Sequence, residues 1–140
     1  MRRIVVAADS FKGSLTSLEV AEVFASGFYR VFPHCEVAKV AVADGGEGTV
    51  EALVQTLGGE RVSVMVHDPL MRPIEACYGI VNGGRTAVVE MSVASGLPLL
   101  TAQERNPLKT TTYGTGEMIA DAFGRGCREF LIGIGGSATN

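Results

Sequence analysis

Short apolar runs alternate with longer stretches of helical periodicity along the first half of the chain. The runs are rich in β-branched residues and end at polar residues, which is typical of buried strands. The longer stretches are bounded by a capping residue, Thr16 or Ser17, or by a closing glycine pair, Gly58-Gly59. The predicted order is a strand at 4–8, a helix at 16–31, a strand at 37–42 and a helix at 49–57. This alternation predicts an α/β fold, a parallel sheet with helices on both faces.

The pattern changes in the second half, where polar and apolar residues alternate and Asn82-Gly83-Gly84 marks a hairpin. The predicted elements are strands at 61–66, 74–81, 86–91 and 130–134 and a helix at 116–123. Such a series favours an antiparallel or mixed sheet. We therefore expect residues 1–66 to be the first segment of an α/β domain and residues 67–140 to belong to a second, mixed α/β domain.

The last residues form a glycine-rich turn directly after a predicted strand, and the chain stops there at Asn140. In an α/β unit a helix should follow such a turn. We therefore interpret the chain as a fragment of a longer protein.

Composition narrows the class of protein. A hydrophobic fraction of 46% and a charged fraction of 19% suit a chain with a real core and argue against disorder. The net charge of −3 does not favour a nucleic-acid or anionic-membrane surface. With no long apolar run and no signal-peptide pattern, we expect a cytoplasmic protein. The three cysteines are far apart and lack metal-ligand spacing, so they are expected to be reduced thiols.

Asp9, Ser10 and Lys12 stand where the first strand ends and a helix approaches. In open α/β sheets ligands bind at this end of the strands. Asp9 is suited to orient a substrate hydroxyl or hold Mg²⁺, and Lys12 to neutralise a transferring phosphoryl group. The structural alternative is a helix cap with a solvated lysine.

Asp44 and Glu47 lie among three glycines before the helix at 49–57. Their carboxylates suit Mg²⁺ or the hydroxyls of a polyol acid better than a phosphate. A tight turn, with Glu47 favoured by the helix dipole, explains the same residues equally well.

Two further segments offer hydroxyls and glycines. Thr115 follows a run of threonines and is either part of an anion site or a helix cap. Gly135, Gly136 and Ser137 form a turn whose backbone N–H groups could bind a phosphate or carboxylate. Neither a GxGxxG loop nor a Walker A motif is present, which excludes a P-loop kinase on motif grounds.

Three other side chains have less specific settings. His34 and His67 lack partner spacing for a metal or a triad, so surface or turn roles are expected. Glu90 ends a predicted strand and either lines a cleft or pairs locally, with the cleft favoured. Taken alone, the residues indicate an α/β enzyme for a phosphorylated or acidic small ligand, without naming the reaction.

Five ordered segments resemble the bacterial glycerate kinase family over the whole chain. They are residues 9–15, 42–49, 90–97, 111–117 and 132–140. The chain departs from the family pattern at Ala8, where a proline is usual, and at Tyr113, where an arginine is common. The resemblance implies a two-domain α/β enzyme that uses ATP and Mg²⁺ to phosphorylate D-glycerate, giving 2-phosphoglycerate. A fragment of that enzyme is expected to be inactive alone.

The resemblance also implies a set of residues that line the cleft between the domains: Asp9, Ser10, Lys12, Asp44, Glu47, Gly135, Gly136 and Ser137. Asp9, Lys12 and Asp44 are the expected catalytic residues, with Asp9 or Asp44 as possible Mg²⁺ ligands. The expected substrate- or phosphate-binding residues are Ser10, Glu47, Thr115, Gly135, Gly136 and Ser137. The alternatives are a non-catalytic sugar-acid binding domain and a phosphoglycerate phosphatase or mutase.

Overall fold

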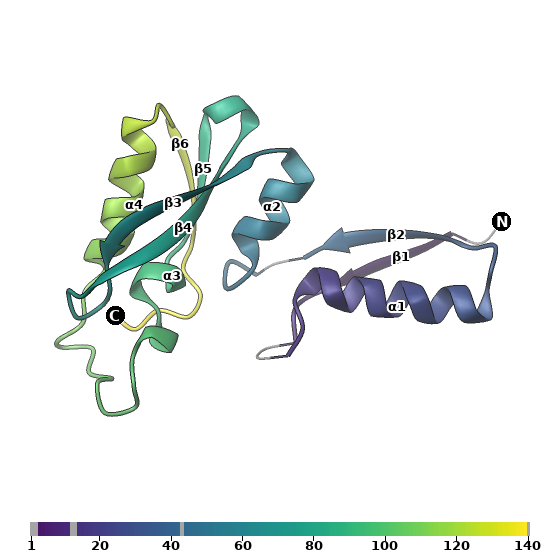
Figure 1. Ribbon diagram of the computed structural model, residues 1–140, viewed down its shortest axis with the longest axis horizontal. Helices are drawn as coiled ribbons and strands as arrows, with labels where there is room; N and C mark the ends of the chain where they lie inside the picture. Colours follow the sequence, from purple (N-terminus) through teal and green to yellow (C-terminus); the bar gives the residue numbers. More distant parts are fainter. Residues whose placement is uncertain (1–2, 12–13, 43, 140) are drawn as a thin grey trace. The chain divides into compact units, whose positions relative to one another are not determined.

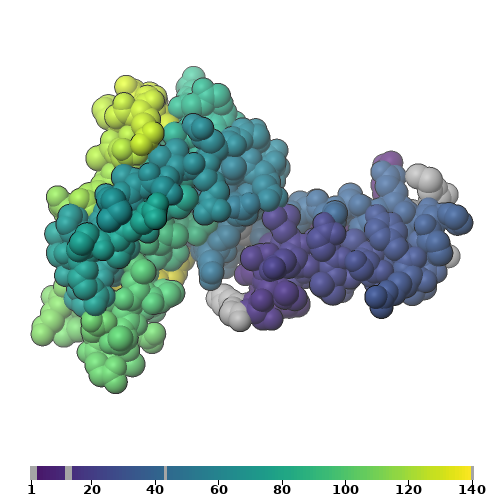
Figure 2. All heavy atoms as spheres, in the orientation of Figure 1, coloured from purple at the N-terminus to yellow at the C-terminus, as the bar shows by residue number. Residues whose placement is uncertain are grey.

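The computed structural model describes residues 3–11, 14–42 and 44–139 and divides the chain into two compact units, Met1–Asp44 and Gly45–Asn140. In Figure 2 the first unit is coloured purple to blue and the second unit mainly teal to yellow. The units divide between Asp44 and Gly45, whereas the predicted boundary near residue 67 concerns the domains of the whole protein and stays a prediction.

The first unit is a strand–helix–strand motif of β1 (Arg3–Ala8), α1 (Ser17–Val31) and β2 (Glu36–Ala41). The strands pair in parallel, from Arg3 opposite Glu36 to Ala8 opposite Ala41. Thr16 begins the helix with a capping box, in which its hydroxyl accepts from the Glu19 N–H and the Glu19 carboxylate accepts from the Thr16 N–H. These hydrogen bonds lower the pKa of Glu19. The predicted elements of this segment are confirmed.

The second unit contains a four-stranded mixed sheet in the order β3-β4-β5-β6 (Figure 1). Its strands are β3 (Glu60–His67), β4 (Pro73–Val81), β5 (Thr86–Glu90) and β6 (Glu129–Gly133). The first two pairings are antiparallel, and β5 and β6 run parallel. The predicted change from parallel strands to a mixed sheet is therefore confirmed.

Helices cover both faces of this sheet, α2 (Thr49–Leu57) one face and α4 (Tyr113–Gly124) the other. Val50 of α2 packs with Val81 and Val88 in a small cluster. Met118 and Ala122 of α4 belong to the larger core. Because neighbouring strand residues point to opposite faces, Val88 packs in the small cluster with Val50, while Ala87 and Val89 pack in the larger core with Met118. The α/β class is thus confirmed.

The predicted hairpin is confirmed, and its turn is the 3-10 turn η1 (Asn82–Gly84), with positive φ at all three residues. Two details differ from the sequence predictions. Helix α4 begins at Tyr113 rather than at residue 116. Two short elements that the sequence pattern does not predict, α3 (Ser92–Ser95) and η2 (Leu97–Leu99), follow β5. Among the described residues, no helix has the length and apolar character needed to cross a membrane.

Candidate functional site

Four of the glycine- and hydroxyl-rich segments meet beyond the carboxyl ends of β5 and β6. Four hydrogen bonds join them: Gly135 N–H to Gly45 O (3.1 Å), Leu97 N–H to Gly136 O (2.9 Å), Ala138 N–H to Ser95 O (2.8 Å) and Thr110 Oγ1–H to Ala138 O (2.8 Å). The segments are far apart in sequence, so the sheet brings them together. This edge is where ligands bind in open α/β sheets.

Close backbone packing requires glycine at the last residue of β6 and just after it. A Cβ at Gly133 would lie 2.3 Å from the Gly45 carbonyl oxygen, and one at Gly135 would lie 2.8 Å from the Gly46 Cα. The Gly135 N–H is already donated to the Gly45 carbonyl oxygen, and the expected ligand-binding role of Gly135 stays a prediction. Gly136, with φ of 72°, and Ser137 are the other candidates in this turn.

Thr115 lies inside α4 and is only 4% exposed. Its hydroxyl forms a buried hydrogen bond with the Ser95 hydroxyl, 2.7 Å away. The N-cap of α4 is Thr112, so the interpretation of Thr115 as the cap is wrong. Thr115 holds α3 against α4, and any role in ligand binding stays a prediction.

Glu90 pairs within the fold, at the end of β5. Its side chain is 5% exposed, and its Oε1 accepts a hydrogen bond from the Val50 N–H at 2.7 Å. Burial raises the pKa of this carboxyl, opposed by hydrogen bonds from the Val50 and Gly48 amides, while Glu47 adds to the rise. The favoured interpretation of Glu90 as a cleft-lining acid is therefore wrong, because the carboxylate is paired inside the fold with a backbone N–H forty residues away in sequence.

Asp44 and Glu47 are exposed side chains of the loop that leads into α2. Gly45 and Gly48 of this loop have φ of 89° and 91°, a conformation that favours glycine. The Thr49 hydroxyl donates to the Gly46 carbonyl at 2.8 Å. The loop is thus a defined turn that presents both carboxylates to solvent.

In the first unit, Asp9 is exposed directly after β1, and its Oδ1 accepts from the N–H of the half-buried Ser10 at 2.7 Å. Lys12 lies outside the described residues. The sequence pattern assigns Ser17 only a capping role, yet its hydroxyl donates to the Ala8 carbonyl (2.6 Å) and accepts from the Val42 N–H (3.1 Å). Ser17 thereby ties together the ends of the strands that lead to Asp9 and Asp44.

His67 has a partner that its sequence neighbours do not reveal. Its Nδ1 lies 3.0 Å from both carboxylate oxygens of Glu117, and its backbone N–H donates to the same carboxylate at 2.8 Å. Tyr113 lies edge-on to the imidazole, with ring centroids 5.8 Å apart, and is 54% exposed. The start of α4 therefore presents an exposed aromatic ring beside the imidazole.

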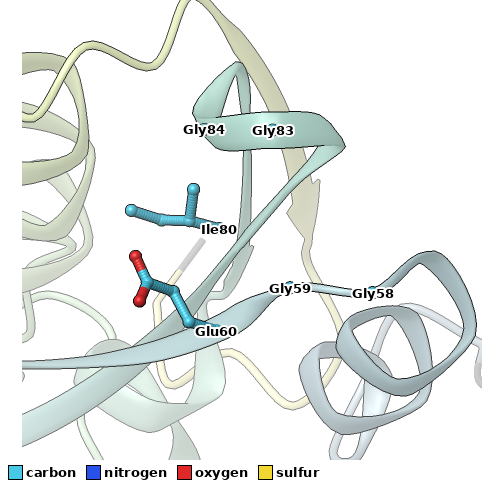
Figure 3. Close-up of a pocket in the computed structure, with 6 residues that line it drawn as sticks. All are labelled: Gly58, Gly59, Glu60, Ile80, Gly83 and Gly84. Carbon is cyan, nitrogen blue, oxygen red and sulfur yellow. The ribbon is translucent and has the colours of Figure 1, made fainter.

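A hollow of about 340 Å³ lies at the other end of the same sheet, where β3 begins and β4 ends (Figure 3). It is lined by the turn at residues 58–60, Ile80 and the Gly83-Gly84 turn. Among the described residues that line it, Glu60 alone is charged, so this hollow does not suit an acidic or phosphorylated ligand.

A metal site made by the described side chains alone is not present, because they form no group of three or more His, Cys, Asp or Glu that could hold an ion. Asp9 and Asp44 fit Mg²⁺ in another way. This ion is commonly held by one or two carboxylates together with substrate phosphates, and two exposed carboxylates follow the neighbouring strands β1 and β2.

Comparison with known proteins identifies the family of the chain. The model of the glycerate kinase family matches residues 4–140. The chain is 51% identical to a glycerate kinase of Bacillus subtilis (strain 168), over 99% of this chain and 36% of that protein. It is 48% identical to a glycerate 2-kinase of Escherichia coli (strain K12), again over 99% of this chain and 36% of the relative.

A solved structure provisionally assigned as a glycerate kinase 2, from Salmonella typhimurium LT2, shares the fold. Its TM-score is 0.84 at 47% identity, over 99% of this chain and 37% of that chain. The chain therefore spans about a third of the length of these relatives. From the family match, the shared fold and the five ordered segments, this chain belongs to the glycerate kinase family.

Proposed function

We propose that the protein containing this chain transfers the γ-phosphoryl group of ATP to D-glycerate and releases 2-phosphoglycerate. The observation that carries the proposal is the family match over residues 4–140. The position of transfer follows the Escherichia coli relative, which is a glycerate 2-kinase. The proposed location of the reaction is the cytoplasm, and the proposed partner is a small organic acid.

The convergence beyond β5 and β6 supports the same proposal. Phosphoryl transfer depends on alignment and charge neutralisation more than on covalent catalysis. Backbone groups can align a ligand only if the loops that carry them are held in place. The hydrogen bond from the Gly135 N–H to the Gly45 carbonyl oxygen holds two of these loops together. Gly136 and Ser137 are the proposed phosphate- or carboxylate-binding residues there, and Glu47 and Ser10 the proposed partners of glycerate hydroxyls.

Charged side chains have the remaining roles. Lys12 is proposed to stabilise the negative charge of the transferring phosphoryl group. Asp9 or Asp44 accepts the proton of the attacking hydroxyl, and the other carboxylate helps to hold Mg²⁺. When bound, Mg²⁺ would neutralise charge on the ATP phosphates.

The test is ADP release by the whole protein with ATP and Mg²⁺, measured with and without D-glycerate. We expect ADP to form only when D-glycerate is present, and D-lactate, which has the same configuration, carboxylate and 2-hydroxyl but no 3-hydroxyl, to be a poor substitute. ADP release that ignores D-glycerate would contradict the proposal. Binding of the acid without turnover would favour a sensing domain, and phosphate release from 2-phosphoglycerate would favour a phosphatase.

A further inference from the structure

We propose that Glu90 is a positioning residue for the reaction. Its buried carboxylate and the turn at residues 133–135 together hold the loop at residues 45–48 in the conformation that presents Glu47. This inference rests on the proposed function and adds a residue to it that does not itself touch the substrate.

The first anchor is at the start of α2. The early N–H groups of a helix have no partner within the helix and need a cap. The N-cap is Gly48, whose φ of 91° lies outside the extended conformation in which a Ser or Asp caps its own helix. Glu90, forty residues away in sequence, supplies the missing acceptor through Oε1, at 2.7 Å from the Val50 nitrogen. A carboxylate there is also favoured by the helix dipole.

The second anchor is at the other end of the loop. The Gly45 carbonyl accepts from the Gly135 N–H at 3.1 Å and lies directly against Gly133. Gly133 is the ladder partner of Glu90 in the parallel pair β5–β6. Both anchors therefore start from neighbouring positions at the end of the sheet, and the loop is fixed at its first residue and just after its last.

The position is unusual for an acid whose only task is to cap a helix. Glu90 is almost fully buried, and burying a carboxylate costs free energy. Two other charges act on it, Glu47 unfavourably and Arg61 favourably. The length of the side chain lets it reach from β5 to the Val50 N–H, and the helix dipole at the start of α2 partly offsets the cost of burying the charge.

The experiment uses the whole protein and compares three substitutions of Glu90. Glu90→Ala removes the acceptor, Glu90→Met removes it while keeping the volume, and Glu90→Gln keeps an acceptor oxygen at the same reach. Loss of the anchor is expected to lower kcat/KM for D-glycerate about 10- to 100-fold, as small misplacements of a site do. Glu90→Gln should stay within about 3-fold of the wild type, because the hydrogen bond is kept.

Tyr78→Phe is the matched control. Tyr78 is also fully buried in the second unit, and its hydroxyl donates to Asp121 at 2.7 Å, on the α4 side of the sheet. Loss of the Tyr78 hydroxyl should lower the free energy of unfolding without changing kcat/KM of the folded enzyme. Equal kinetic losses in Glu90→Met and Tyr78→Phe would reduce Glu90 to a stabilising residue and overturn the proposal.

Hydrogen exchange gives a second readout that does not depend on turnover. In Glu90→Ala and Glu90→Met the amides of residues 45–52 should exchange faster, while those of α4 stay protected. Unchanged exchange at 45–52 would overturn the anchor. A Glu90→Gln variant as inactive as Glu90→Ala, with its loop protected, would also overturn it, since the charge itself would then be needed.

The two proposals can fail separately. If the wild-type protein shows no turnover that depends on D-glycerate, the proposed function fails before any variant is compared. The exchange of residues 45–52 then still decides whether Glu90 anchors the loop.

Discussion

The two units carry their candidate residues in different ways. In Met1–Asp44 the acidic candidates, Asp9 and Asp44, are exposed side chains that follow the strands β1 and β2. In Gly45–Asn140 the loops are fixed by backbone hydrogen bonds, by glycines in close contact and by buried groups such as Thr115 and Glu90. The difference teaches that substitutions in the first unit should change turnover with little loss of stability, whereas substitutions in the second should change both.

The largest effect on turnover is expected at Lys12. Lys12→Ala should lower kcat by ~10²-fold or more, the scale seen when one preorganised electrostatic donor is lost. Circular dichroism and thermal unfolding should match the wild type. Lys39→Ala is the control, because Lys39 forms an exposed ion pair with Glu22 and such pairs contribute at most about 1 kcal/mol. An unchanged kcat in Lys12→Ala would leave Lys12 as a surface residue.

In the second unit, Gly133→Ala should cost both stability and activity. The added Cβ would lie 2.3 Å from the Gly45 carbonyl oxygen, and backbone on both sides cannot move cheaply. Overpacking of this kind typically costs about 1–3 kcal/mol. Denaturant unfolding and kcat/KM measure the two effects. A variant with wild-type stability and activity would show that the Gly45 loop is not held by this contact.

Asp68 should give the second unit a dependence of stability on pH. It is 2% exposed; burial alone would raise its pKa, but hydrogen bonds from Arg72 and Leu70 outweigh it and the pKa is lowered. A lowered pKa means that the stabilisation is present above the unfolded pKa of about 4 and is lost as the pH falls below it.

The measurement is the free energy of unfolding of Asp68→Asn between neutral pH and pH 3. We expect a loss of about 1–3 kcal/mol at neutral pH, which shrinks on acidification. Glu22→Gln in the exposed pair of the first unit should show a loss of at most about 1 kcal/mol. A constant difference between Asp68→Asn and the wild type across this range would contradict the assignment.

The smallest effect is a gain, in the first unit. Gly27 lies within α1, and a Cβ added there would meet no other atom within 4 Å among the described residues. Gly27→Ala should therefore raise stability by about 0.5–1 kcal/mol through helix propensity, without changing turnover. A loss of stability would mean that this face of α1 is covered in the whole protein.

Local patterns predict most of the fold because its elements carry local signals. The helix predicted at 49–57 has the same bounds as α2. Thr16, one of the two predicted capping residues, caps α1 together with Glu19, three residues away. The start of α4 escapes prediction because glycines and a threonine, poor helix formers, occupy its first turn. The short α3 has only four residues, too few for a periodic signal.

The candidate site is less predictable, because its contacts join distant parts of the chain. No local pattern shows that Glu90 accepts from Val50 or that Gly133 lies against Gly45. The hydroxyl of Thr115 is polar in sequence but is used inside the fold by Ser95. The family resemblance identifies the segments, while the structure shows which of their groups are already used in packing.

One measurement tests phosphoryl transfer to glycerate most directly, a ³¹P NMR spectrum of the whole protein with ATP, Mg²⁺ and D-glycerate. We expect ADP and one new phosphate ester in equal amounts. Because the phosphorus of 2-phosphoglycerate is coupled to a single ester proton, its signal should be a doublet, whereas a 3-phosphate would give a triplet. A triplet would contradict the position of transfer, and inorganic phosphate without any ester would contradict the kinase itself.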